Sequence, residues 1–81
     1  MARSTLRKTL RTKEHQRLIE LLVAAREGAG LTQRDLAARL KRPNSFVGRI
    51  EAGERRVDVI EFIAIARALQ ANPKELFESL L

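Results

Sequence analysis

Three polar residues close together in the sequence, Asn44, Ser45 and Arg49, have side chains suited to hydrogen bonding with the edges of nucleic-acid bases. An asparagine amide forms a bidentate pair with adenine and an arginine guanidinium forms one with guanine, each giving roughly 1–3 kcal/mol of base preference. Serine discriminates less. Gly48 has no side chain, and we expect it only to permit close approach of the backbone.

Two short helices with a tight break between them are predicted to position these residues, within the stretch 31–53. Thr32 and Asp35 have the spacing of a capping box at the start of the first helix. Pro43 ends that helix and is tolerated in the first turn of the next, which we expect over about 44–52. The residues that recur on one apolar face are Leu36, Ala37, Leu40, Val47 and Ile50. Two such helices form a helix-turn-helix.

The stretches LTQRDLAARL and IEAGERR, together with Val47 and Ile50, resemble the DNA-binding domains of the Cro and CI repressors of phages, the XRE family. The resemblance covers about residues 12–81 and implies an all-α, compact five-helix lambda-repressor-like domain. It implies base contacts by Asn44, Ser45 and Arg49, and contact of Gln33 with the DNA backbone. Several positions depart from the family pattern: Lys41 where the turn often has Gly, Pro43 at the usual helix cap, Ala52 for Asn and Val57 for Pro.

Other residues around the helix-turn-helix are candidates for supporting roles. Arg42, Arg55 and Arg56 flank the second helix and are predicted to contact phosphates, which set register but carry no sequence information directly. The alternative is that each is a solvated surface charge. The resemblance also implies an ion pair between Arg26 and Glu51, which we expect to be structural and to orient the second helix. Phe46 either packs over thymine methyl groups or belongs to the core, and we favour the core.

Cap residues and apolar spacing predict that the remaining elements are also helices. Thr12 is the expected N-cap of a helix that runs to Glu27 or Gly28. Asp58 caps a helix to Leu69 or Gln70 that is apolar almost all round, which is typical of a helix in the core or against another chain. Asn72 and Pro73 open a last helix.

Charge is distributed unevenly along the 81 residues, which carry a net charge of +6. Residues 1–57 hold 14 basic and 6 acidic residues, whereas residues 58–81 hold 2 basic and 4 acidic. Residues 1–11 have no acidic residue, and we predict a flexible basic arm that contacts DNA through Arg3, Arg7, Lys8 and Arg11. The alternative is a solvated segment without a role.

The last helix carries two apolar lines, Leu76 with Leu80 and Phe77 with Leu81. A domain of this size is too small to cover both, so we expect one line to form a dimer interface. The alternative is that both cap the core. Relatives generally bind as two-fold dimers on half-sites about one helical turn, roughly 34 Å, apart.

The residues and the resemblance together therefore predict a sequence-specific DNA-binding transcriptional regulator, most simply a repressor, that binds an inverted-repeat operator as a homodimer. The alternative is an antitoxin or adaptor that holds a protein partner on its apolar C-terminal surface. No set of residues typical of an enzyme is present, and neither a cofactor nor a small-molecule ligand is expected. His15 alone, without cysteine, argues against a metal site. The absence of cysteine suits the cytoplasm, and the longest apolar stretch is too short to span a membrane.

Overall fold

The computed structural model describes residues 12–81, which form five helices and no strand within that range. The helices are α2 (Lys13–Gly28), α3 (Gln33–Arg39), α4 (Ser45–Glu51), α5 (Val59–Ala68) and α6 (Pro73–Glu78). The predicted all-α, five-helix architecture is confirmed. Leu40, Asn44 and Ala52, which we expected inside the two short helices, are instead their cap residues.

Polar side chains cap the start of four of these five helices. The caps are Thr12, Thr32, Asp58 and Asn72, and each side-chain oxygen accepts a hydrogen bond from a first-turn backbone N–H. Asp35 and Glu61 complete capping boxes with Thr32 and Asp58. Asn44 precedes α4, but its side chain makes no capping hydrogen bond. The Asn44 amide is therefore not used in starting the helix.

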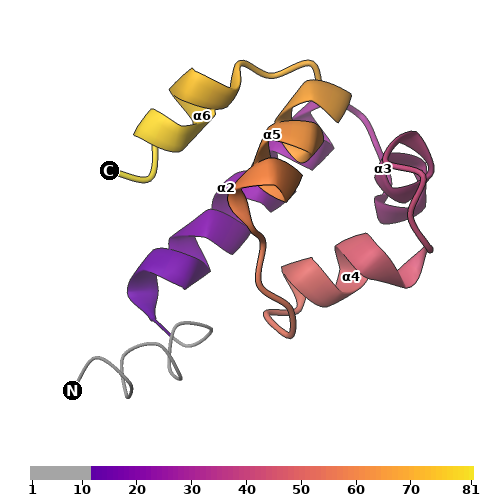
Figure 1. Cartoon of the computed structure of the whole chain (residues 1–81), viewed down its shortest axis with the longest axis horizontal. Coiled ribbons are helices and arrows are strands. Elements are labelled where there is room, and N and C mark those ends of the chain that lie inside the picture. The colour runs from indigo at the N-terminus through magenta and orange to yellow at the C-terminus, as the bar shows by residue number, and fades with distance from the viewer. Residues whose placement is uncertain (1–11) are drawn as a thin grey trace.

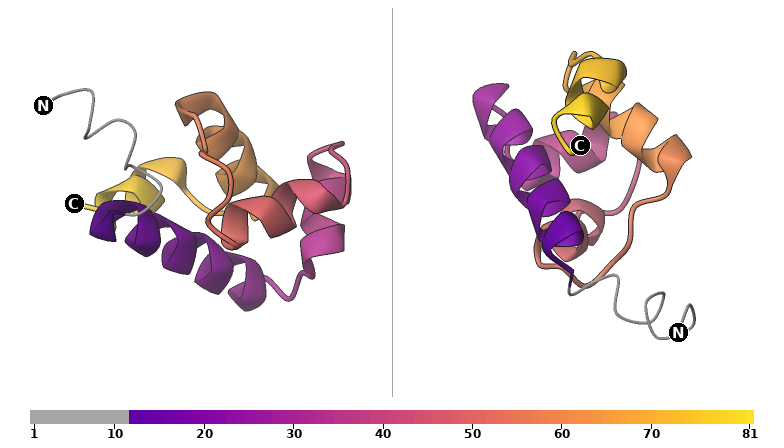
Figure 2. Two further views of the ribbon diagram at one scale, coloured as in Figure 1. Left: turned by 90° about the horizontal axis from the view of Figure 1, so that it is seen from below. Right: turned by 90° about the vertical axis from the view of Figure 1, so that its left-hand side faces the viewer.

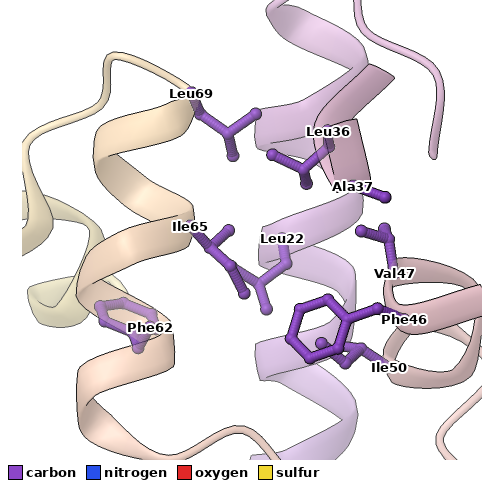
Figure 3. Close-up of a cluster of buried hydrophobic side chains, with 9 residues drawn as sticks. All are labelled: Leu22, Leu36, Ala37, Phe46, Val47, Ile50, Phe62, Ile65 and Leu69. Atoms are coloured by element: carbon purple, nitrogen blue, oxygen red, sulfur yellow. The ribbon is translucent and has the colours of Figure 1, made fainter. Parts of the chain in front are cut away.

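The hydrophobic core lies where α5 faces α2, α3 and α4 (Figure 3). Its residues are Leu22, Leu36, Ala37, Phe46, Val47, Ile50, Phe62, Ile65 and Leu69. Figure 1 shows α3 and α4 at one end of the molecule and α6 at the other. In Figure 2, α2 runs along one side of the molecule. The core therefore supports α4 from behind and leaves its opposite face exposed.

Apolar side chains also reach the surface of α5 and α6. Val59 is 72% exposed and Ile60 is 74% exposed, although Phe62, Ile65 and Ala66 of the same helix are buried. On α6 and the residues that follow it, Leu76 and Leu80 pack against the core, whereas Phe77 is 52% and Leu81 86% exposed. Of the two lines predicted for the last helix, the second is the more exposed.

The break between α3 and α4 contains a residue in the left-handed region. Lys41 has φ 55°, where the backbone crowds a Cβ atom at a cost of roughly 1–2 kcal/mol. This conformation explains why glycine is common here in the family that the sequence resembles. The turn is also held by a hydrogen bond from the Arg42 backbone N–H to the Ala37 carbonyl, at 3.0 Å.

Replacing Lys41 with glycine is expected to stabilise the fold by about 0.5–1 kcal/mol, because relief of the Cβ crowding exceeds the added entropy of the unfolded chain. Urea denaturation followed by circular dichroism measures the change. The Lys41→Ala variant is the control, since it removes the same charge but keeps the Cβ atom. Equal stability of the two variants would contradict the explanation.

Candidate nucleic-acid interface

The exposed face of α4 carries the predicted base-contacting residues. Phe46, Val47 and Ile50 bury the opposite face, which leaves Asn44, Ser45 and Arg49 exposed. Phe46 is a member of the core, as we favoured from the sequence. Seven residues of α helix are about 10 Å long, so the face offers only a few side chains to a groove.

A pocket of about 190 Å³ brings together residues from α4 and from both of its flanking loops. It is lined by Arg42, Pro43, Ser45, Phe46, Arg49 and Arg55. Two predicted base contacts and two predicted phosphate contacts therefore share one concave surface. Asn44 is exposed beside this surface but does not line the pocket.

The ends of α2 and α4 are joined by the expected ion pair between Arg26 and Glu51. The guanidinium donates two hydrogen bonds to the carboxylate, at 2.7 and 3.0 Å, and a third to the Leu31 carbonyl oxygen at 2.7 Å. The two side chains are only 11% and 8% exposed. The hydrogen bond with Glu51 is the main cause that raises the pKa of Arg26. The pair fixes the end of α4 against the end of α2.

Gln33 extends this network to the first turn of α3. Its amide Nε2 donates to Glu51 Oε1 at 2.8 Å. A Cβ atom added at Gly48 would lie 3.2 Å from Gln33 Oε1, so the missing side chain leaves room for the glutamine. Gln33 remains exposed, and its second amide N–H is not used by the bond to Glu51.

Arg42 and Arg55 converge on the ring of Phe46. Their guanidinium carbons lie 4.6 and 4.7 Å from the ring centroid, within the range of cation–π attraction. Arg55 also donates to the backbone carbonyl of Arg56 at 2.7 Å. Arg56 itself is exposed and lines a separate open depression with Arg55 and neighbouring acidic residues.

Glu61 of α5 binds both of these arginines. Arg55 donates to its two carboxylate oxygens at 2.9 and 2.8 Å, and Arg42 donates to Oε2 at 3.4 Å. The hydrogen bonds from Arg55 are the main cause that lowers the pKa of Glu61 to about 2. Glu61 is therefore ionised at neutral pH.

Glu61 was not predicted from the sequence as a partner of the arginines. The Asp58–Glu61 spacing signals only the capping box, since Glu61 lies 19 residues from Arg42 and meets it through the fold. The exposure of Val59 and Ile60 was not predicted either. Arg3, Arg7, Lys8 and Arg11 of the predicted arm lie outside the described residues.

Within residues 12–81, no group of three or more potential ligand side chains is arranged to hold a metal ion. No helix in that range combines the length and apolar character needed to cross a membrane.

Comparison with known proteins places nearly all of the described residues in a helix-turn-helix family. Residues 17–80 match a family model described as a helix-turn-helix domain. An XRE-family like protein from Pseudomonas syringae pv. tomato str. DC3000 is 46% identical, with a TM-score of 0.83 over 94% of this chain and 93% of that chain. No curated protein matches the sequence.

Two restriction-modification controller proteins have similar structures. C.AhdI from Aeromonas hydrophila is 32% identical, with a TM-score of 0.73 over 82% of this chain and 100% of that chain. Wild-type C.Esp1396I is 22% identical, with a TM-score of 0.78 over 85% of this chain and 91% of that chain, which shows a shared fold.

Proposed function

The chain belongs to the XRE family of helix-turn-helix DNA-binding transcriptional regulators, and from this premise we propose that it binds an inverted-repeat operator as a homodimer. Its simplest role is that of a cytoplasmic repressor, which binds over a promoter and blocks its use. The observation that carries the proposal is the pocket on α4, where Ser45 and Arg49 lie with Arg42 and Arg55 on one exposed surface. Likeness to the restriction-modification controller protein C.AhdI supports a regulatory role.

In this proposal α4 enters the major groove and its exposed face meets the base edges. Asn44, Ser45 and Arg49 contact bases, and the absence of a capping bond leaves the Asn44 amide available for adenine. The predicted contacts with the DNA backbone are Gln33, Arg42, Arg55 and Arg56, with Arg3, Arg7, Lys8 and Arg11 of the arm. The free amides at the start of α3 add to the attraction for phosphate near Gln33.

The proposed dimer interface is the apolar surface of α5 and α6. A groove of about 150 Å³ is lined mainly by Leu18, Val57, Val59, Phe62, Phe77 and Leu80, and Leu76 of the same helix as Phe77 packs against the core. Ile60 and Leu81 add further exposed apolar area. A second copy is the fitting occupant because one short recognition helix reads few base pairs, and a two-fold partner supplies a second half-site.

Selection from a library of random duplex DNA, followed by binding at several salt concentrations, tests this function. We expect an enriched inverted repeat with half-site centres about ten base pairs apart, and affinity that falls steeply as salt rises. Failure to enrich any sequence above bulk DNA would contradict operator recognition. Stoichiometric co-purification of a second protein, together with that failure, would favour the antitoxin or adaptor alternative.

A further inference from the structure

We propose that Glu61, together with Arg55, positions Arg42 for contact with a DNA phosphate. Glu61 lies on α5, outside the helix-turn-helix, and does not line the pocket on α4. Its role is therefore exerted through the two arginines. The inference rests on the proposed function, since it assumes that the face carrying these arginines binds DNA.

The guanidinium groups of Arg42 and Arg55 approach one another at Glu61, because Nη2 of each donates to Glu61 Oε2, at 3.4 and 2.8 Å. Each guanidinium also lies over the ring of Phe46. Two positive charges in that arrangement repel each other. The carboxylate of Glu61 accepts hydrogen bonds from both and opposes this repulsion. Phe46 belongs to the core, so the cluster is anchored at one side by packing and at the other by the start of α5.

The two arginines differ in how much of their hydrogen-bonding capacity remains. Arg55 uses both terminal nitrogens on Glu61 and one of them also on the Arg56 carbonyl. Arg42 makes a single, longer bond of 3.4 Å and its side chain is 46% exposed. Most of the five guanidinium N–H groups of Arg42 are thus not used in the bond to Glu61. Arg42 is the group that a phosphate would reach, and Arg55 and Glu61 hold it beside the pocket.

The direction of the change in DNA affinity on removal of Glu61 tests the proposal, because net charge alone and positioning of the arginines predict changes in opposite directions. Taking one negative charge from a DNA-binding surface should strengthen binding. If Glu61 instead orders the arginines, its loss adds the cost of immobilising them on DNA. We therefore expect Glu61→Gln to bind the selected operator about tenfold more weakly than the unaltered protein. A loss of this size corresponds to the cost of immobilising one or two flexible side chains on binding.

The experiment measures operator affinity against salt for the unaltered protein, Glu61→Gln and the control Glu54→Gln. Glutamine at position 61 retains an oxygen that can accept the capping-box hydrogen bond from the Asp58 backbone N–H. Glu54 is an exposed acidic residue in the loop that carries Arg55. We expect Glu54→Gln to bind as tightly as the unaltered protein or tighter. For Glu61→Gln we expect weaker binding and a log–log salt slope shallower by about one, the loss of roughly one phosphate contact. Tighter binding by Glu61→Gln with a steeper slope would overturn the proposal.

Two further measurements separate positioning from general destabilisation. In the unaltered free protein, NMR order parameters of the Arg42 and Arg55 Nε–H groups should approach those of rigid backbone, about 0.85, and values typical of mobile side chains would overturn the proposal. Adding Glu61→Gln to Arg42→Ala should weaken binding little beyond Arg42→Ala alone, whereas fully additive losses would overturn it. Absence of DNA binding by the unaltered protein would contradict the proposed function itself.

Discussion

Replacing Glu51 with glutamine is expected to lower the free energy of unfolding by about 3–5 kcal/mol, because it leaves the largely buried charge of Arg26 without its partner. Glutamine has nearly the same shape, so packing is retained while the carboxylate charge is lost. Small domains are stable by only about 5–15 kcal/mol, and the melting temperature should therefore fall by more than about 10 °C. Thermal and urea unfolding followed by circular dichroism measure both quantities.

The control is Glu20→Gln, which makes the same chemical change at an exposed position of α2. Its effect should stay within about 0.5 kcal/mol. Replacing both partners with apolar residues, Arg26→Met with Glu51→Leu, should recover part of the loss since no unpaired charge is then buried. A melting temperature of Glu51→Gln equal to that of the unaltered protein would show that the pair contributes nothing to stability.

Replacing Val59 with aspartate is expected to convert the proposed dimer to monomers and to weaken operator binding by about a hundredfold or more. Val59 lines the apolar groove and is mostly exposed in a single chain. A carboxylate there would have to be desolvated against the second copy. The affinity lost is that gained by linking two half-site contacts, about 10²–10⁴.

The Val59→Asp substitution is expected to preserve the fold of each chain. Val59 is the first residue of α5, where a negative charge is favourable to the helix dipole. The control is Ala24→Glu, an exposed position of α2 outside the groove, which adds the same charge. Analytical ultracentrifugation and operator titration should show an unchanged dimer for the control. A Val59→Asp variant that still sediments as a dimer would place the interface elsewhere.

The helices of this protein are determined largely by local sequence. Thr32 with Asp35 and Asn72 with Pro73 specify helix starts through hydrogen bonds and backbone angles within one turn of chain. Apolar spacing then identifies the face that each helix buries, as Val47 and Ile50 do for α4. These are short-range effects, so they can be predicted before any helix is placed against another.

The pair of Arg26 and Glu51 was predictable only through the resemblance to a family. The two residues are 25 positions apart, and nothing in their local sequence indicates that they meet. The exposed positions of Asn44, Ser45 and Arg49 followed from the helix-turn-helix pattern. Their roles at DNA remain predictions for the experiments above.

Tertiary structure alone decided which charges and which apolar side chains remain available at the surface. Glu61 meets Arg42 only because α5 packs behind the helix-turn-helix, and Phe46 is shared by two arginines from different loops. Likewise, Leu80 is partly covered by the core while Val59 is left exposed. The sequence alone shows which residues are apolar or charged. Since burial and ion pairing depend on which elements come into contact, only the packed chain determines their partners.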